Sequence, residues 1–188
     1  MSDTLTGGFA APAVEAAEAF RAVLQAMARP GRIARVGGAV PPAPCSPAAG
    51  VVLLTLVDAD TPLHLAGRHD CAGLRDWVRF HTGAPLVGAS DAAFALGDWA
   101  ALGPLERYAQ GIPEYPDRSA TLIVELPALE AAGTRLTGPG IRDMAALSLP
   151  EVDAFARNAA RFPLGLDFIL TAGDRLAALP RTTRVEAG

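Results

Sequence analysis

The sequence predicts an α/β protein in which one mixed β-sheet is sandwiched by helices. Segments with apolar residues at helical spacing interleave with short runs of β-branched and apolar residues, without a strict strand–helix–strand repeat. The chain has 188 residues, which is enough for one domain with a sizeable core and too few for two comfortable ones. We therefore expect residues 1–188 to form a single domain.

The N-terminal part of the chain predicts a helix, a short strand and a second helix. The stretch PAVEAAEAFRAVLQAMARPG begins with Pro12 in a first-turn position and ends in a Pro-Gly pair, which favours a helix between them. Residues 32–36 follow as a short strand, and GGAVPPAPCSPAAG as a loop. Ser46 before Pro47 is typical of a helix N-cap. We expect a buried helix over residues 48–57, although its VVLLTLV core would also suit a strand.

The middle of the chain predicts a strand, a helix and further strands. TPLHLAG is expected to be a strand, and Asp70 is expected to cap the helix CAGLRDWVRFHTG, which Gly83 ends. One face of that helix carries Leu74, Trp77, Val78 and His81. APLVG and AAFAL predict short strands, and SATLIVEL, residues 119–126, is the clearest strand of the chain.

The C-terminal part predicts a strand, a helix and a hairpin. RLTGPGI is typical of a strand that ends in a tight turn, and LPEVDAFARNAARF of an amphipathic helix closed by Pro163. LDFILT and RLAALP, joined by AGD, predict a β-hairpin.

Composition and charge exclude several classes of function. All sixteen basic residues are arginines, so no lysine is present for a pyridoxal phosphate aldimine, a P-loop or Schiff-base catalysis. The net charge of −4, without a basic stripe, argues against nucleic acid as a partner. The longest apolar run, residues 48–57, is far shorter than the roughly 20 residues that span a bilayer. Cys45 and Cys71 match no metal or redox spacing, and MSDTLTGGFAAPAVE does not look like a secretory signal, so we expect a cytoplasmic protein with two free thiols.

Four segments together resemble one known family. They are RFHTGAPL (79–86), LTGPGI (136–141), FPLGLDFILT (162–171) and ALPRTTRVE (178–186), and FRAVLQAMARPG and LLTLVDADTP support them. In order and spacing they are similar to the PhnH family, the H subunit of bacterial carbon–phosphorus lyase, over nearly the whole chain.

This resemblance carries expectations about fold, partners and function. It implies a fold like the large domain of pyridoxal-phosphate-dependent transferases without the cofactor site, and no cofactor. It implies a homodimer that joins the G, I and J subunits in a core complex. It also implies a role with the G, I and L subunits in making α-D-ribose 1-methylphosphonate 5-triphosphate from ATP and methylphosphonate.

His81 is the only candidate for a catalytic base that the motifs single out. At a helix C-terminus, however, the helix dipole favours a protonated imidazole and the ring can bond the last carbonyl groups. A general base would need a carboxylate to orient it, and the sequence places none nearby. We therefore favour a structural or interface role for His81 and for the neighbouring Arg79.

The group HLAGRHDC carries His64, His69, Asp70 and Cys71 within eight residues. Metal ligation is one interpretation, but the spacing is not that of a zinc motif. A strand end followed by a helix cap is the simpler explanation, and we expect no metal site.

Two further groups could together bind phosphate. The TGPG turn, with Gly138 and Gly140, could form a nest of backbone amides, and Arg181, Thr182 and Thr183 could add a guanidinium and two hydroxyls. A tight turn and the exposed face of a strand explain the same residues without a ligand, and we favour them.

Asp167 lies inside the apolar run LGLDFILT, where a carboxylate is costly unless an arginine or backbone amides meet it. We expect its partner to be Arg79 or Arg181. Such a buried pair could fix the sheet or the dimer without doing chemistry.

Three hypotheses about function remain open at this point. The preferred one is a non-catalytic subunit of the carbon–phosphorus lyase system. The second is a stand-alone phosphate- or nucleotide-binding transferase domain around Arg181 and the TGPG turn. The third is a pyridoxal phosphate site without aldimine chemistry.

Overall fold

The computed structural model describes residues 5–188, and its helices and strands alternate along the chain as predicted. The helices of this part are α1 (Pro12–Ala28), α2 (Pro47–Leu56), α3 (Ala72–Thr82), α4 (Trp99–Leu102) and α5 (Val152–Ala159), with short 3-10 helices η2 (Gly67–His69), η3 (Ala89–Asp91) and η4 (Leu105–Arg107). The strands are β1 (Ala34–Arg35), β2 (Leu63–Leu65), β3 (Phe94–Asp98), β4 (Gln110–Ile112), β5 (Tyr115–Ser119), β6 (Thr121–Glu125), β7 (Thr134–Thr137), β8 (Ala145–Leu147), β9 (Asp167–Ala172), β10 (Arg175–Leu179) and β11 (Arg184–Glu186).

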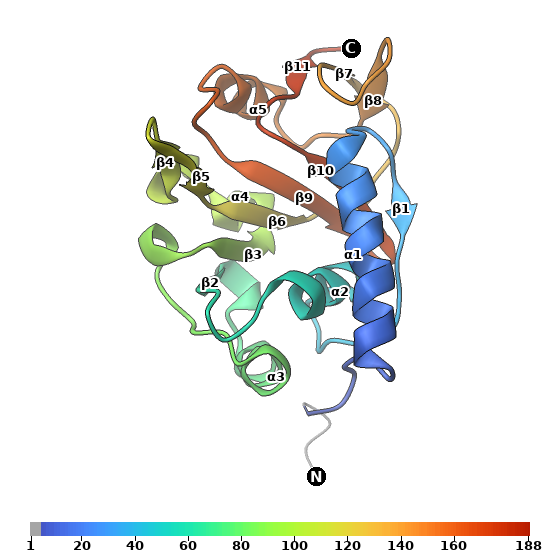
Figure 1. The fold of residues 1–188 in the computed structure, drawn as a ribbon, viewed down its shortest axis with the longest axis vertical. Helices are drawn as coiled ribbons and strands as arrows, with labels where there is room; N and C mark the ends of the chain where they lie inside the picture. Colours follow the sequence, from blue (N-terminus) through green and yellow to red (C-terminus); the bar gives the residue numbers. More distant parts are fainter. Residues whose placement is uncertain (1–4) are drawn as a thin grey trace.

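A six-stranded sheet in the order β1-β10-β9-β6-β3-β2 forms the centre (Figure 1). β2, β3, β6 and β9 run parallel to one another, whereas β10 is antiparallel to both of its neighbours. The predicted mixed sheet is thereby confirmed. A smaller antiparallel sheet, β11-β7-β8, and the β4-β5 pair lie outside it.

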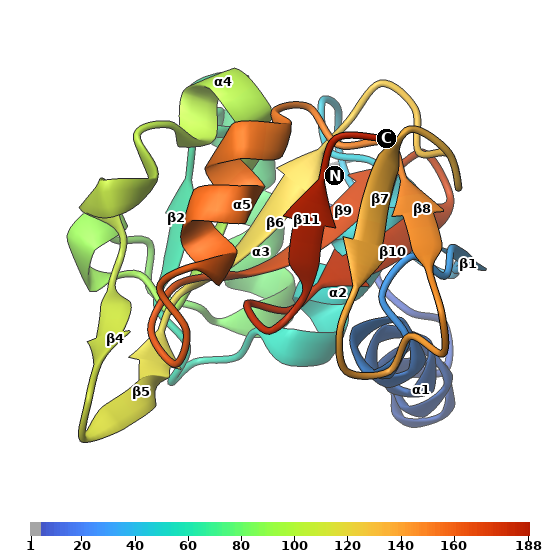
Figure 2. The same cartoon turned by 90° about the horizontal axis from the view of Figure 1, so that it is seen from above.

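Both faces of the central sheet are covered, but not only by helices. Figure 2 shows α1, α2 and α3 on one face, with α4, α5 and the β11-β7-β8 sheet on the other. The predicted sandwich by helices is correct for the first face. On the second face the small sheet takes the place of a helix, because short strands bury Leu136, Leu147 and Val185 there.

The alternation of side chains along β6 and β9 explains these two layers. Ile123 and Ile169 pack into the core beneath α2 and α3, whereas their neighbours Leu122, Val124 and Phe168 pack into the opposite core. Successive side chains of a strand point to opposite faces. Central strands covered on both sides therefore need continuous apolar runs such as TLIV and FILT.

The second helix resolves the ambiguity of VVLLTLV. Ser46 is its N-cap, and the Ser46 side chain accepts a hydrogen bond of 3.1 Å from the backbone N–H of Ala49. The helix is apolar around most of its circumference because it lies between the sheet and α1. The prediction of a buried helix is confirmed, and a helix buried on most sides explains why no clear helical period was visible.

The third helix ends as predicted but begins differently. Gly83 takes a left-handed conformation at φ 71°, which glycine adopts without strain, and it closes the helix. The prediction that Asp70 caps the start is wrong: the N-cap is Cys71, without a side-chain hydrogen bond. The Asp70 carboxylate instead accepts two hydrogen bonds from Arg75, at 2.5 and 2.7 Å.

The C-terminal hairpin is confirmed. Arg175 pairs with Ala172 across a two-residue turn, and Gly173 has a φ of 58° at its first position. The interpretation of Arg181, Thr182 and Thr183 as the face of a strand is wrong, since they form a turn between β10 and β11. Proline at position 180 ends β10 because it cannot donate to the ladder.

Some boundaries differ from the predictions. Only Leu86 of APLVG pairs with a strand, through an isolated bridge to Leu63. The 119–126 segment splits into the end of β5 and β6, and the β4-β5 pair and β8 were not predicted. The fifth helix ends at Ala159, before Pro163.

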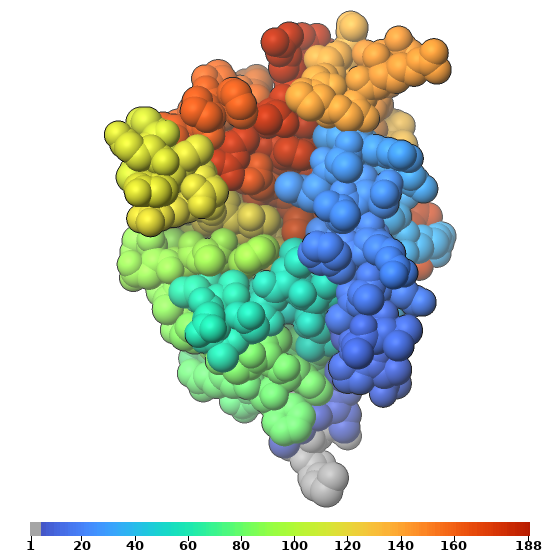
Figure 3. All heavy atoms as spheres, in the orientation of Figure 1, coloured from blue at the N-terminus to red at the C-terminus, as the bar shows by residue number. Residues whose placement is uncertain are grey.

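In the space-filling view, α1 forms a ridge along one side of the molecule, and the β4-β5 pair projects at the opposite margin (Figure 3). Between residues 5 and 188, no helix combines the length and the apolar character that crossing a bilayer requires.

Candidate functional site

A buried ion pair joins two of the segments that the sequence singled out. Asp167, the first residue of β9, accepts hydrogen bonds from the backbone N–H of Arg181 at 2.8 Å and from its Nε at 3.2 Å. Its other carboxylate oxygen accepts from Arg181 Nη2 at 2.5 Å. The side chains are only 13% and 18% exposed, for Arg181 and Asp167 respectively. Of the two predicted partners for Asp167, Arg181 is therefore the correct one, and we call this pair the latch.

The guanidinium group of the latch has no free donor. An arginine side chain carries five N–H donors, and those of Arg181 also donate to the carbonyls of Pro116 and Pro163 and to the Ser119 hydroxyl. The latch thus joins the start of β9 and the turn after β10 to β5 and to the loop after α5. A phosphate at Arg181 would have to displace these acceptors, so the geometry favours a structural role over ligand binding.

The two predicted phosphate-binding groups do lie side by side. A hollow of about 460 Å³ is lined by both turns, including Gly138, Pro139, Thr182 and Arg184, with Phe162 beside them. A Cβ on Gly138, whose φ is 128°, would lie 3.1 Å from the carbonyl oxygen of Thr182. The backbone at Gly138 therefore packs closely against the backbone of the turn that carries Thr182.

The remaining residues of these turns have structural surroundings. Gly140 packs so closely on the end of α1 that a Cβ would lie 2.0 Å from the carbonyl oxygen of Ala28. The Thr183 side chain is buried, and its hydroxyl has no hydrogen-bond partner in the described part of the chain. Binding of a ligand by these residues stays the less favoured hypothesis.

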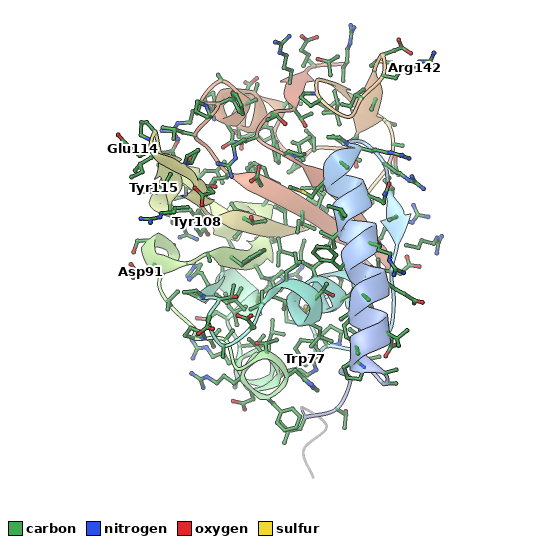
Figure 4. All side chains as sticks on the ribbon, viewed as in Figure 1. Trp77, Asp91, Tyr108, Glu114, Tyr115 and Arg142 are labelled. Carbon is green, nitrogen blue, oxygen red and sulfur yellow. The ribbon has the colours of Figure 1, made fainter. Side chains whose placement is uncertain are left out.

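His81 packs against aromatic rings. Its ring centroid lies 4.9 Å from those of Trp77 and Phe80, and a Cβ on Gly8 would lie 2.5 Å from its Cε1 atom. Figure 4 shows Trp77 on the side of α3 that faces the rest of the protein. The ring therefore lies where α3 meets the N-terminal segment. Arg79 is exposed on the same helix and does not reach Asp167.

The HLAGRHDC residues turn to different partners. The Nδ1 atom of His64 lies 3.0 Å from the carbonyl oxygen of Val87, and Asp70 pairs with Arg75. Burial lowers the pKa of His69, whose ring nitrogens meet no partner within residues 5–188. Over the same residues, no three histidine, cysteine or acidic side chains gather in a way that could hold a metal ion.

A buried carboxyl group at the end of β6 was not foreseen. Glu125 is 8% exposed and accepts a hydrogen bond of 2.7 Å from the backbone N–H of Ser46, at the start of α2. Burial raises the pKa of Glu125, and the bond from Ser46 opposes that shift. Burial, and then the charge of Glu125, raise the pKa of the neighbouring Cys45 thiol. The cluster ties β6 to α2 and makes Cys45 a poor nucleophile.

A larger hollow lies elsewhere, between α4 with η4 on one side and α5 on the other. It has a volume of about 710 Å³, and we call it the α4–α5 pocket. The two helices lie next to each other on the second face of the sheet (Figure 2). Side chains of both signs and one aromatic ring line it, among them Trp99, Glu106, Glu151, Arg157 and Arg161.

Sequence reasoning missed this pocket. Its residues are spread from position 99 to position 161, and none belongs to the motifs that carry the family resemblance. Arg157 and Arg161, four positions apart at the end of a predicted amphipathic helix, were the one visible signal.

Comparison with known proteins agrees with the resemblance. Residues 7–186 match the family described as bacterial phosphonate metabolism protein (PhnH). The chain belongs to the PhnH family. A relative from Rhizobium meliloti (strain 1021), named α-D-ribose 1-methylphosphonate 5-triphosphate synthase subunit PhnH, is 42% identical over 98% of this chain and 97% of its own length. Another from Stutzerimonas stutzeri, named putative C-P lyase subunit protein HtxG, is 34% identical over 89% of this chain and 84% of its own.

Three of the four PhnH-like segments meet at the latch. FPLGLDFILT supplies Asp167 and the carbonyl of Pro163, ALPRTTRVE supplies Arg181, and LTGPGI lies against the turn that carries Arg181. In this chain the family motifs thus converge on a buried ion pair that joins the start of β9 to β5 and to the turn after β10.

Proposed function

We propose that this chain is a subunit of the bacterial carbon–phosphorus lyase system. It acts with the G, I and L subunits in the synthesis of α-D-ribose 1-methylphosphonate 5-triphosphate from ATP and methylphosphonate. The observation that carries this proposal is the 42% identity, over nearly the full length of both chains, to the Rhizobium meliloti protein named as a subunit of that synthase.

The geometry supports a role in assembly rather than a separate catalytic centre. The most conspicuous histidine, His81, packs between aromatic rings instead of facing a carboxylate. Arg181, the arginine that the motifs suggest for binding phosphate, has all of its guanidinium donors occupied within the fold. Each motif residue that resembles a catalytic group is thus better explained by the packing around it.

Reconstitution tests the proposal. The chain is produced alone and together with the G, I, J and L subunits, and ATP and methylphosphonate are added. Formation of the ribose triphosphate product is followed by phosphorus NMR. We expect product with all subunits and a loss of product when this chain is left out. Turnover by this chain alone would establish the competing function, a stand-alone transferase, and undisturbed turnover without it would also refute the proposal.

We also propose that the chain forms a homodimer and joins the G, I and J subunits. An exposed apolar stripe on α1, consisting of Ala13, Ala17, Phe20 and Leu24, supports the dimer. These residues recur at helical spacing on one face. An antiparallel copy of α1 about a twofold axis near Phe20 would bring Glu18 of each copy near Arg21 of the other, which favours a second copy as the occupant.

Sedimentation of Phe20→Glu/Leu24→Glu tests the stripe. Like charges at the axis should give a folded monomer where the unchanged protein gives a dimer. A matched change on the polar flank, Gln25→Glu, should leave the dimer intact. A Phe20→Glu/Leu24→Glu protein that still sediments as a dimer would remove α1 as the interface.

Three further statements belong to the same proposal. The chain forms one domain, and a central sheet whose six strands come from both halves of the chain supports this. The fold is related to the large domain of pyridoxal-phosphate-dependent transferases and lacks their cofactor site. The protein acts in the cytoplasm, where ATP is available.

Visible absorbance after incubation with pyridoxal phosphate checks that the cofactor site is lacking. A new absorbance band that survives gel filtration would contradict this.

A further inference from the structure

The α4–α5 pocket has the size of a small-molecule site. Its volume is about 710 Å³, and ligand pockets typically enclose roughly 300–1,000 Å³. Such sites combine apolar surface with a few fixed polar groups. The question is whether its polar groups are held in place and still have free donors.

The aromatic wall of the pocket is fixed from two directions. Trp99 stacks on Phe155 with ring centroids 4.7 Å apart and an angle of 21° between the rings, and Phe155 packs on Phe168 in turn. The indole N–H of Trp99 donates to a carboxylate oxygen of Glu151 at 3.1 Å. The ring is therefore preorganised, and a flat group can stack beside it without a large loss of entropy.

The side chain of Gln110 positions Arg161, and hydrogen bonds fix the orientation of Gln110 in turn. Gln110 donates from Nε2 to the carbonyl oxygens of Leu105, at 2.9 Å, and Tyr108, at 3.1 Å. Both amide hydrogens are thus used, which leaves the side-chain oxygen of Gln110 to accept from Arg161 Nη1 at 3.2 Å. The guanidinium of Arg161 donates no other hydrogen bond to the described residues.

Arg157 lines the same pocket, and its guanidinium also has most of its donors free. Its Nη2 atom lies 3.5 Å from Glu151, and its guanidinium has no further partner among residues 5–188. Of the five donors that each arginine carries, most remain available at the edge of the pocket. Two guanidinium groups with open donors form a typical receptor for a phosphoryl group, which can accept bidentate hydrogen bonds.

The acidic residues narrow the choice of ligand. Glu106 accepts no hydrogen bond within the described part of the chain, so its carboxylate is free to accept from a hydroxyl. Two glutamates beside two arginines leave the lining close to neutral, which disfavours a highly charged polyphosphate.

We propose that the α4–α5 pocket binds a nucleoside monophosphate. The phosphoryl group is held by Arg157 and Arg161, a ribose hydroxyl donates to Glu106, and the base stacks on Trp99. The choice of a phosphoryl group over a carboxylate rests in part on the proposed function. The pocket itself does not, because it is defined by the contacts above.

Calorimetric titration of AMP into the isolated full-length chain tests the pocket. We expect AMP to bind, and adenosine and inorganic phosphate to bind at least roughly tenfold more weakly, because each makes only part of the contacts. In Arg157→Ala/Arg161→Ala the Kd for AMP should rise by roughly tenfold or more. Both arginines are exposed, so the variant should fold, which circular dichroism can check.

A matched control uses an exposed arginine outside the pocket. Figure 4 shows Arg142 near β8, away from α5, and Arg142→Ala should bind AMP as the unchanged protein does. Equal binding by the folded double variant and the unchanged protein would overturn the proposal, as would no binding of AMP by the folded chain at millimolar concentration. Product formation by the assembled subunits is measured separately, so the proposed function can fail while the pocket stands, and the reverse.

Discussion

An arginine–aspartate pair lies at each end of the β9–β10 hairpin, and the two pairs differ in their surroundings. At the open end, Arg181 and Asp167 are largely buried and share three hydrogen bonds. At the turn, Arg35 and Asp174 meet in a single bond of 2.7 Å, and their side chains are 69% and 49% exposed.

The number of guanidinium donors that the protein already occupies shows whether an arginine can still bind a ligand. The donors of Arg181 are all taken by the protein, so this residue stabilises the fold, whereas Arg157 and Arg161 resemble Arg35 and keep most of theirs. A motif that contains arginine therefore does not by itself indicate an anion site. The number of occupied guanidinium donors distinguishes a structural arginine such as Arg181 from one that can bind an anion.

The largest expected effect comes from breaking the latch. Arg181→Ala leaves the Asp167 carboxylate buried without its cation and two backbone carbonyls without donors. Removing one partner of a buried pair typically lowers the free energy of unfolding by about 3–5 kcal/mol. Urea unfolding followed by circular dichroism measures the change.

Two companion variants sharpen that result. Arg181→Lys keeps the charge but cannot reproduce the planar fork, so its loss should lie between those of the unchanged protein and the alanine variant. Arg184→Ala, an exposed arginine three positions later, should stay within about 0.5 kcal/mol of the unchanged protein. A loss for Arg181→Ala no larger than that for Arg184→Ala would mean that the latch does not hold the C-terminal half together.

The latch was accessible to sequence reasoning, whereas the pocket was not. Asp167 stood in an apolar run, and the cost of burying a carboxylate required a cation from elsewhere in the chain. That argument needs no tertiary structure. The α4–α5 pocket depends on how Trp99, Gln110 and Arg161 approach in space, and its members are common surface residues in sequence.

The predictions for helices and strands show the same contrast: features set by local sequence signals were predicted correctly, and features that depend on contacts formed in the fold were not. The N-cap at Ser46 and the helix stop at Gly83 are local signals, and both predictions are confirmed. Asp70 was wrongly assigned to the cap because Arg75, five positions later, takes its carboxylate. β5 escaped notice since YPDRS contains a proline and charged residues, which only an edge strand tolerates.

The next largest effect is a dependence of stability on pH. It comes from Glu125, a buried carboxyl group to which no cation of the described chain is bonded. Because burial raises the pKa of Glu125 in the folded protein, the folded state holds a proton that the unfolded chain has lost. The free energy of unfolding should therefore fall as pH rises from the ordinary pKa of a glutamate, near 4.5, through that of the folded state. Glu125→Gln cannot titrate and still accepts the hydrogen bond from Ser46, so this decline should disappear.

Unfolding by urea at several values between pH 4 and pH 8 checks the sign. Carboxyl groups whose pKa is lowered by hydrogen bonds, such as those of Asp58 and Asp70, contribute equally to both proteins and cancel in the difference. The stability of Glu125→Gln relative to the unchanged protein should rise steadily with pH. A difference that does not change with pH would show that Glu125 titrates as it does in the unfolded chain.

The smallest effect belongs to the pair at the turn, and it completes the comparison. A double-mutant cycle with Arg35→Ala and Asp174→Asn keeps the turn, because asparagine suits it as aspartate does. Exposed pairs of this kind typically couple by about 0.2–1 kcal/mol, and 1 M salt should remove most of that. The same cycle on Arg181 and Asp167 should give a larger coupling that salt changes little, because burial shields most of both side chains from water and ions. If both couplings were equally sensitive to salt, burial would not be what distinguishes the two ends of the hairpin.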